Sequence, residues 1–376
     1  MNSEPLKALH IVGQLEFGGI TTWLKTLVET APSNELDIDI CCDYRKGIGI
    51  LAEDFIRLGC KVYHVPLDYN LFNYQKKLKQ IIKKNQYQVI HSHRSFLSGP
   101  SLKAAASMEV PVRIAFHHSC VSDLAHGFFR DRYYSLTKRW ELKYATHIWG
   151  SSEAVLMENY GLEWESKDKR LNYLYGPVKF SPPENNSRER IRQEEGIDLS
   201  DRVIGIVGRV TQIKNPIVAL KVCLEILKKY SDVQILWVGD GDLLPCLKEI
   251  AEKSGFVHKI HFLGFRRDVV NILEAVDIFF QPSKSEGFGL SILEALHVGL
   301  PVVASNASGI LEALPKTMQH FCSKPDDVDA HVSNIRKLLD NPVNRYIPRE
   351  FLVNFSPNNF YQRLISSYKQ AFEGAA

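Results

Sequence analysis

Two carboxylates in a glycine-rich stretch are the first residues that could do chemistry. Glu286 and Glu294 have seven residues between them, in the run SEGFGLSILEALHVGLPVVAS. Gly287 and Gly289 leave the backbone free to turn tightly beside the first acid. Carboxylates placed in this way could bind the hydroxyl groups of a sugar or a ribose. A second interpretation stays open, because Ser291 and Glu294 also fit a helix capping box, S-x-x-E.

Two cations that precede this stretch could bind the phosphate groups of the same ligand. Arg209 and Lys214 follow an apolar segment, 203–207, that ends at Gly208. Arginine offers paired donors and lysine a point charge, so the two could flank a diphosphate. Alternatively, Arg209 and Lys214 are ordinary surface cations that bind no ligand. Their position directly after a predicted strand and a glycine makes this alternative weaker.

Both groups fall at the carboxyl ends of segments with the pattern of buried strands. Residues 203–207 and 276–280 are apolar runs, and helical spacing follows them at 216–230 and from Leu290 onward. The free N–H groups at the N-terminus of such a helix could bind a phosphate. Strands alternate with helices along the whole chain, which predicts an α/β fold with two doubly wound parallel sheets.

The first half of the chain offers weaker candidates. Gly18 and Gly19 lie between a predicted strand and a predicted helix, where they could form an anion cradle. The predicted strand 112–116 ends in His117 and His118. Open α/β sheets keep their ligands at the carboxyl ends of strands, so we favour a functional role for one of these two histidines.

Composition narrows the class of protein. A chain of 376 residues predicts two domains, and an apolar content of 45% is that of a soluble globular protein. The seven cysteines form no C-x-x-C pair, so we expect a reducing, cytoplasmic compartment. A net charge of +3 is too weak to indicate nucleic acid. We also expect no metal site, because the second half has neither zinc spacing nor paired aspartates.

Pattern shifts along the chain predict the domain boundaries. We expect an N-terminal Rossmann-like domain at 1–178, a linker rich in Pro, Asn and charge at 179–200, and a C-terminal domain at 201–356. An amphipathic helix at 357–373 would pack back on the first domain. A basic helix at 73–84 could contact a membrane, or could simply lie on its sheet and face solvent.

Four ordered motifs resemble the donor domain of retaining nucleotide-sugar glycosyltransferases of family four, which have the GT-B fold. They are GRVTQIKNP, VGDGDLL, FLGFRRDV and SEGFGLSILEALHVGLPVVAS, and the resemblance covers nearly all of residues 201–315. The first half resembles the family more loosely, through GQLEFGGITTWL and VIHSH. The resemblance implies two Rossmann-like domains facing a central cleft, in the capsular or exopolysaccharide branch.

The resemblance also implies roles for particular residues. Arg209 and Lys214 match the pair that binds the donor diphosphate. Glu294 matches the acid on the ribose hydroxyls, and Glu286 matches the acid that faces the donor sugar. The other matched positions, in the nucleobase segment, the donor loops and the first-domain loop, are Gly18, Gly19, Gly208, Phe265, Arg266, Gly287, Phe288, Gly289 and Leu290.

The same resemblance extends to the reaction. His117 best matches the cleft histidine near the transferred sugar, with His118 one register step away, and Glu286, Arg209 and Lys214 complete the expected catalytic group. The implied enzyme moves a sugar from a nucleotide-sugar, which we expect to be a UDP-sugar, to a lipid-linked saccharide at the cytoplasmic membrane face. It would need no cofactor or metal. A GT-B nucleotide-sugar epimerase and a non-catalytic scaffold or regulatory subunit that binds the nucleotide-sugar stay open as alternatives.

Overall fold

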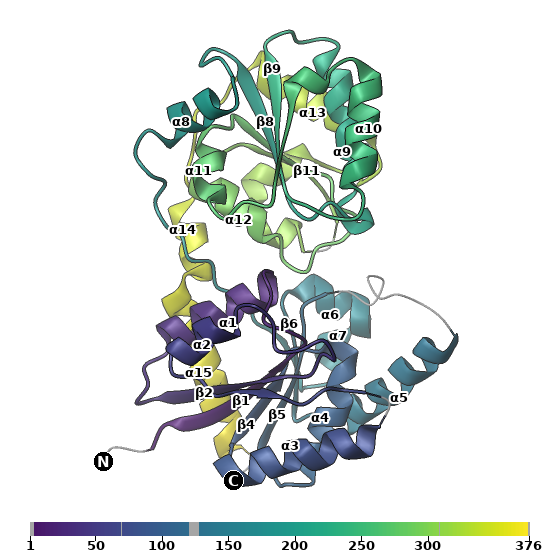
Figure 1. Ribbon diagram of the computed structural model, residues 1–376, viewed down its shortest axis with the longest axis vertical. Helices are drawn as coiled ribbons and strands as arrows, with labels where there is room; N and C mark the ends of the chain where they lie inside the picture. Colours follow the sequence, from purple (N-terminus) through teal and green to yellow (C-terminus); the bar gives the residue numbers. More distant parts are fainter. Residues whose placement is uncertain (1–3, 69, 120–127, 308, 375–376) are drawn as a thin grey trace. The chain divides into compact units, whose positions relative to one another are not determined.

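The protein forms two compact α/β units. A computed structural model describes residues 4–68, 70–119, 128–307 and 309–374. Unit 1 comprises Met1–Lys179 with Phe355–Ala376, and unit 2 comprises Phe180–Asn354. Each unit contains one parallel sheet with helices on its faces, so the predicted α/β architecture is confirmed (Figure 1).

Unit 1 contains a seven-stranded parallel sheet in the order β3-β2-β1-β4-β5-β6-β7. The sequence folds this way because its apolar runs are short and nearly continuous, as in strands buried on both faces. The strands are β1 (Leu6–Val12), β2 (Leu36–Cys42), β3 (Val62–His64), β4 (Val89–Ser92), β5 (Val112–His117), β6 (His147–Gly150) and β7 (Leu171–Tyr173).

Helices of unit 1 bury apolar side chains against both faces of this sheet. On one face α1, α2 and α15 share a core with the strands, and on the other face α3 and α4 do so. The helices are α1 (Gly19–Thr30), α2 (Ala52–Arg57), α3 (Leu71–Asn85), α4 (Gly99–Ala106), α5 (Phe128–Tyr144), α6 (Glu153–Tyr160), α7 (Trp164–Lys167) and α15 (Pro357–Glu373).

Helix α15 comes from the far end of the chain. Its apolar side is fully buried in the core of unit 1, where Phe360, Leu364 and Tyr368 pack with Trp23 of α1 and Phe116 of β5. Helix 357–373 therefore belongs to the first unit, and the chain passes through unit 2 before it completes unit 1 (Figure 1).

Unit 2 contains a six-stranded parallel sheet in the order β10-β9-β8-β11-β12-β13. The strands are β8 (Arg202–Val207), β9 (Val233–Val238), β10 (Ile260–Gly264), β11 (Ile278–Gln281), β12 (Val302–Ser305) and β13 (Cys322–Ser323). The helices are α8 (Ser187–Glu194), α9 (Pro216–Leu227), α10 (Leu244–Ser254), α11 (Val269–Glu274), α12 (Leu290–His297), α13 (Val328–Asp340) and α14 (Arg349–Leu352).

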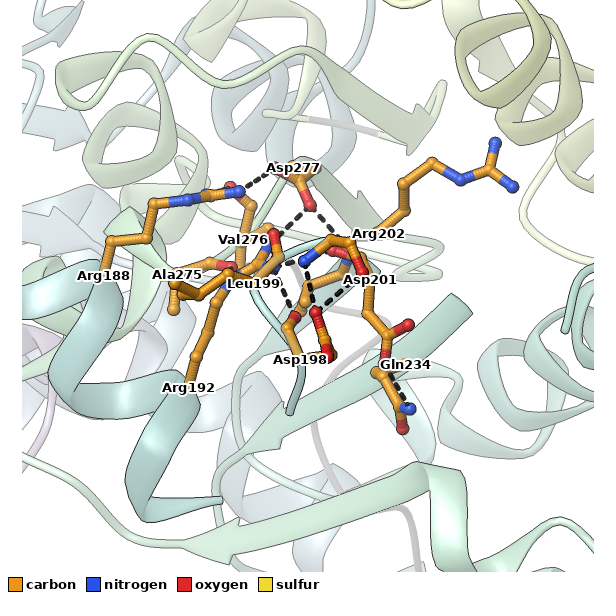
Figure 2. A network of polar contacts seen from close by, with 12 residues as sticks. Arg188, Arg192, Asp198, Leu199, Asp201, Arg202, Gln234, Ala275, Val276 and Asp277 are labelled. Atoms are coloured by element: carbon orange, nitrogen blue, oxygen red, sulfur yellow. Dashed lines mark hydrogen bonds and ion pairs between the residues drawn. The ribbon is translucent and has the colours of Figure 1, made fainter. Parts of the chain in front are cut away.

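The segment expected to be a linker is instead partly folded into unit 2. Residues 187–194 form helix α8, and its Arg192 is fully buried. The guanidinium donates to Asp277 at 2.8 Å and to the carbonyl oxygen of Asp201 at 2.7 Å, and it also reaches the carbonyls of Asp198 and Leu199 (Figure 2). Within 179–200, Arg192 thus anchors a buried hydrogen-bond network, while most of the other polar side chains are exposed. A free linker was the wrong interpretation of the part that forms α8.

Each sheet contains one place where the strand order reverses. In unit 1 the chain leaves β1 toward β2 on one side, and β4 lies on the other. In unit 2 it leaves β8 toward β9, and β11 lies on the other side. The loops that follow two such strands diverge and leave a crevice at their carboxyl ends, which is where open α/β sheets bind ligands.

Candidate functional site

The crevice of unit 2 brings together Gly208, Arg209, Lys214 and Glu286, four of the residues that the sequence singled out. Gly208 and Arg209 follow β8, and Glu286 lies in the loop that follows β11. The backbone N–H of Lys284 donates to the carbonyl of Ile213 at 2.8 Å, which joins the β11 loop to the loop that follows β8. The strand order therefore brings together two segments that lie about seventy residues apart in sequence.

Lys214 and Glu286 form an ion pair in this crevice. The lysine Nζ contacts Oε1 of the glutamate, and the two side chains expose 23% and 9% of their surface. A pair that is this enclosed is weakly screened by salt, unlike a surface pair. The structure thus unites one cation and one acid of the predicted donor site.

Glu286 also accepts hydrogen bonds from two neutral side chains that the sequence interpretation did not single out. Gln281 Nε2 donates to its Oε1 at 2.5 Å, and Ser283 Oγ donates to the same oxygen at 2.9 Å. Both donors are buried. Their only signal in the sequence is polarity at the end of an apolar strand, which does not distinguish a site residue from an ordinary strand boundary.

The second acid, Glu294, lies in helix α12 in a different environment. Its side chain is half-buried, and within the described ranges it makes no hydrogen bond or ion pair. Burial raises the pKa of Glu294 to about 7, because the charged carboxylate loses water without gaining a partner. Near neutral pH this group is therefore ready to exchange a proton or to accept hydroxyl donors.

The capping-box interpretation of Ser291 and Glu294 is wrong. Helix α12 begins at Leu290, and its N-cap is Gly289, with a left-handed φ of 56°. Ser291 Oγ donates to the side-chain carbonyl of Gln281 at 2.7 Å. Glycine suits this N-cap because other residues rarely adopt that backbone conformation, and Glu294 is thereby left free of a capping role.

Arg209 is exposed, and it has no ion-pair partner in the part of the chain that the structure describes. It follows Gly208 directly, and both line a small hollow with Lys214, Gln281 and Trp237. A free guanidinium at the mouth of such a hollow can take a phosphate with paired donors.

The predicted nucleobase segment follows β10. Phe265 is 55% exposed. Arg266 donates to both oxygens of Asp268, at 2.8 and 2.6 Å, so its guanidinium is already occupied. This segment can therefore offer a base its backbone and an aromatic face more readily than a free charge.

In unit 1, Gly18 and Gly19 lie exposed where helix α1 begins. Gly18 is the N-cap of α1, and the first turn of the helix holds no acid. A Cβ on Gly18 would meet no described atom within 4 Å. The first N–H groups of α1 are thus accessible to an anion, as the prediction requires.

His117 points away from solvent. It is fully buried, and its Nε2 lies 2.8 Å from Tyr160 Oη and 3.2 Å from Glu141 Oε1. Its Nδ1 lies 3.3 Å from the amide of Asn159. His118 is the half-buried member of the pair, so its position, and not that of His117, suits contact with a substrate.

His118 ends a buried chain of histidines. Its Nε2 lies 2.7 Å from His93 Nδ1, and His93 Nε2 lies 2.9 Å from His10 Nδ1. Beyond them, Tyr368 Oη contacts His91 Nδ1 at 2.6 Å and His10 Nε2 at 3.4 Å. Burial lowers the pKa of His10 and of His118 to about 3, and it lowers the pKa values of His91 and His93 well below 6.5.

Three of these histidines invite a metal interpretation. The ligand atoms of His10, His91 and His93 lie within 4.8 Å of one another, the one such group among the described residues. The rings of His91 and His93 are stacked, however, with centroids 4.4 Å apart and planes 9° from parallel. Lone pairs on stacked rings run side by side and do not converge on one ion, so this arrangement favours a packed hydrogen-bond chain.

Two family descriptions match the chain. Residues 187–358 match "Glycosyl transferases group 1", and residues 17–156 match "Glycosyltransferase Family 4". Every predicted site residue named above lies inside one of the two matched ranges.

Individual proteins agree with these family matches. EpsF of Bacillus subtilis (strain 168), described as a glycosyltransferase, is 25% identical over 314 residues, which cover 82% of this chain and 81% of EpsF. The UDP-Gal:α-D-GlcNAc-diphosphoundecaprenol α-1,3-galactosyltransferase of Escherichia coli is 27% identical over 339 residues, 84% of this chain and 83% of that enzyme. The crystal structure of Anabaena HepE with UDP superposes with a TM-score of 0.80 at 16% identity, covering 97% of this chain and 100% of HepE.

Proposed function

The chain belongs to family 4 of the retaining nucleotide-sugar glycosyltransferases, with the GT-B fold, and we propose that it transfers a sugar from a UDP-sugar to a lipid-linked saccharide during surface-polysaccharide synthesis. The observation that carries the proposal is the joining of Lys214 to Glu286 in the crevice of unit 2. A cation for the diphosphate and an acid for the sugar are adjacent there, as a nucleotide-sugar requires.

Arg209, Lys214 and the donor loops would hold the diphosphate. Arg209 is exposed and supplies paired donors. Lys214, whose side chain is 23% exposed, lines the same hollow and supplies a point charge. As the bond between the anomeric carbon and the diphosphate breaks, negative charge builds up on the leaving phosphate. Cations already in place stabilise that charge without further reorganisation.

The two acids would bind opposite ends of the donor. Glu286 is fixed through one oxygen, and its other oxygen would accept a hydroxyl of the sugar. Glu294 has no protein partner in the described ranges and would accept the ribose hydroxyls. In unit 1 we propose Gly18, Gly19 and one of the two histidines at the end of β5 as substrate contacts. His118 is the better candidate, because it is half-buried whereas His117 is fully buried.

Transfer with retention would occur on one face of the sugar. The acceptor oxygen forms its bond to the anomeric carbon on the side that the diphosphate leaves, and the acceptor proton passes to the departing phosphate oxygen. This route assigns no covalent nucleophile to the protein, and none of the residues placed in the crevice is arranged as one.

The nature of the donor and acceptor rests on the relatives. The Escherichia coli relative is named for UDP-galactose and a diphosphoundecaprenol-linked sugar, and the HepE crystals contain UDP. No helix among the described residues is long and apolar enough to cross a bilayer. A lipid-linked acceptor would therefore have to be met at the membrane surface.

Helices α3 and α5 offer a surface for that encounter. Helix α3 contains five lysines and no acid, and Phe72 near its start is 79% exposed. Helix α5 exposes Leu136 and Leu142 beside Arg139. Cations with interspersed apolar side chains bind anionic lipid surfaces. Sedimentation with anionic vesicles tests this, and no binding at low salt would contradict it.

The decisive experiment measures donor turnover. Purified protein should release UDP when given a UDP-sugar and a lipid-linked saccharide, and a thermal-shift screen of UDP-glucose, UDP-galactose, UDP-N-acetylglucosamine and GDP-mannose would identify the donor. Lys214→Ala and Glu286→Gln should each lower the rate by at least about 100-fold, the typical effect of losing a charge-stabilising group. The matched control is Lys253→Ala, which removes an exposed lysine paired with Glu249 on α10.

Three outcomes distinguish the proposal from its rivals. Loss of turnover in the two site variants, with normal turnover in Lys253→Ala, supports transfer. Donor conversion without any acceptor would indicate an epimerase. Donor binding without turnover under every acceptor would contradict the proposal in favour of a binding subunit.

A further inference from the structure

Gln281 is a buried polar residue at the end of an apolar strand. Strand β11 reads Ile-Phe-Phe-Gln, and the glutamine is 4% exposed. Burying an amide without partners costs stability, so its contacts are informative. Both ends of this amide are used, because Nε2 donates to Glu286 Oε1 at 2.5 Å and Oε1 accepts from Ser291 Oγ at 2.7 Å.

These contacts fix which way the amide points. With the observed orientation, the NH₂ group faces a carboxylate and the carbonyl faces a hydroxyl donor. The reverse orientation would place the carbonyl of Gln281 against the carboxylate of Glu286. Because Ser291 lies in the first turn of α12, the start of that helix sets the direction of the amide.

The result at Glu286 is asymmetric. Its Oε1 receives Lys214, Gln281 and Ser283, whereas its Oε2 has no partner among the described residues. One oxygen is thus fixed by the protein and the other is left for a ligand. A Cβ on Gly309 would lie 2.3 Å from the backbone carbonyl of Glu286, so the loop is also closely packed from behind.

We propose that Gln281 is a positioning residue that holds Glu286 in place for the donor sugar when Lys214 turns to the diphosphate. This inference rests on the proposed function. In the structure Lys214 pairs with Glu286, but a bound diphosphate would compete for the same ammonium group. Gln281 and Ser283 are neutral, so no phosphate competes for them, and they continue to solvate and orient the enclosed carboxylate.

The position of Gln281 is consistent with a role in the site. It lines the same small hollow as Gly208, Arg209 and Lys214. A purely structural glutamine would affect folding alone. A positioning glutamine would affect the sugar half of the donor and leave the UDP half unchanged, which gives a measurement that separates the two roles.

The experiment measures how tightly the protein binds UDP and three UDP-sugars, which are UDP-glucose, UDP-galactose and UDP-N-acetylglucosamine. The wild type is compared with two variants, Gln281→Met and Gln281→Glu. Gln281→Met keeps the size of the side chain and removes the donor. We expect it to weaken binding of the preferred UDP-sugar relative to UDP by about 10-fold, the scale of one hydrogen bond to a charged group. With an acceptor present, we expect kcat to fall by a similar factor.

Gln281→Glu supplies a readout that packing alone would not change. At pH 8 the introduced carboxyl is ionised and repels Glu286, so discrimination between UDP-sugar and UDP should be worse than in Gln281→Met. Among the described residues, the ionisable side chains that line the same hollow are Arg209 and Lys214, and comparison with the wild type at pH 8 removes their contribution.

The matched control is Gln234→Met on strand β9, whose amide donates to Asp201 at 2.8 Å on the same sheet (Figure 2). It should leave the ratio of UDP-sugar to UDP affinity unchanged. An unchanged ratio in both Gln281 variants, or an equal change in Gln234→Met, would overturn the inference. If the Gln281 variants lose UDP-sugar affinity relative to UDP affinity in a protein that shows no turnover, that result would sustain the inference and refute the proposed transfer. If the wild type binds none of these nucleotides, both the inference and the proposed transfer are refuted.

Discussion

Two glutamates eight positions apart show how the surroundings decide what a carboxylate can do. Glu286 is surrounded by a lysine, an amide and a hydroxyl. Glu294 is half-buried without a partner in the described ranges, and burial raises its pKa to about 7. The first acid is fixed in geometry, whereas the second can change its protonation when a ligand arrives.

The raised pKa of Glu294 predicts that donor binding depends on pH. Ribose hydroxyls donate to the ionised carboxylate, so binding favours the form that has lost its proton. Affinity for UDP-glucose should therefore increase by about tenfold from pH 6 to pH 8, the change in ionised fraction for a group that titrates near 7. Calorimetry in buffers of different ionisation enthalpy should detect the proton released on binding.

Glu294→Gln provides the control for this pH effect. It should bind UDP-glucose more weakly and with little dependence on pH. UDP-glucose is preferable to UDP because it lacks the terminal phosphate that itself titrates near pH 6. Equal affinity of the wild type at pH 6 and pH 8 would rule out a role for Glu294 at the ribose.

At the scale of elements, helix α8 is held by a buried arginine beside one buried apolar side chain, Ile191. Arg192 contacts Asp277 and the carbonyls of Ala275, Asp198, Leu199 and Asp201, from 2.7 to 3.1 Å (Figure 2). Asp277 in turn accepts the backbone N–H of Val203 at 2.8 Å. One side chain thus joins α8, the loop before β8 and the loop before β11.

Removing that side chain should destabilise unit 2. Arg192→Met leaves four backbone carbonyls and Asp277 without their buried donor, and losing one partner of a buried ion pair typically costs about 3–5 kcal/mol. We expect a drop of this size in the unfolding free energy of unit 2, measured by urea denaturation with hydrogen exchange to separate the units.

The same helix offers a matched surface control. Arg190 forms ion pairs with Glu184 and Glu194 but is 39% exposed. Arg190→Met should change stability by less than about 1 kcal/mol, as exposed pairs do. Similar losses in Arg190→Met and Arg192→Met would show that α8 is not held by the buried network.

The order and type of the elements could be predicted because they depend on local pattern. Apolar runs of strand length alternate with amphipathic segments, and the predicted helix 73–84 and final helix 357–373 lie within a few residues of α3 and α15. The linker prediction for 179–200 failed for a different reason. Charge and proline are typical of linkers, and the sequence gives no sign that Arg192 finds Asp277, 85 residues away.

The same limit applies to the site. Glu286 and Lys214 could be singled out from their neighbours and from family resemblance, but their contact spans 72 residues and depends on the order of strands. The side chains of His117 and His118 lie on opposite sides of the backbone, as consecutive residues of a strand do. Which of them is buried depends on the packing of α5 and α6, which no local pattern specifies.

At the scale of the whole molecule, the two units should differ in their response to acid. Unit 1 contains the neutral chain of His10, His91, His93 and His118. Burial lowers the pKa of His10 and of His118 to about 3 and lowers the pKa values of His91 and His93 well below 6.5. In unit 2, within the described ranges, His331 is the one histidine that is fully buried. The number of suppressed protonations is therefore much larger in unit 1.

The sign of the effect follows from these shifts. Above pH 6.5 the four histidines are neutral in both the folded and the unfolded chain. As the pH falls below 6.5 the unfolded chain takes up protons that the folded unit does not, so each histidine lowers stability by about 1.4 kcal/mol per pH unit. Asp43, whose pKa burial raises to about 6, acts in the opposite direction between pH 6 and pH 3.8 and offsets about one histidine.

Hydrogen-exchange mass spectrometry at pH 7.5 and pH 5 can resolve this difference, after correction for the intrinsic exchange rate. We expect peptides from β1, β4 and α15 to lose protection at pH 5 well before peptides from β8 and β11. Equal acid sensitivity of the two units would contradict the neutral histidine chain.

The place of α15 in the core of unit 1 also has a consequence for how the chain is made. A ribosome delivers residues 1–179 before helix α15, so their core lacks Phe360, Leu364 and Tyr368 until residues 357–373 have been translated. Residues 180–354 are contiguous and can fold as soon as they emerge. The nascent protein would then complete its second unit before its first, and its earliest segment would depend longest on chaperones.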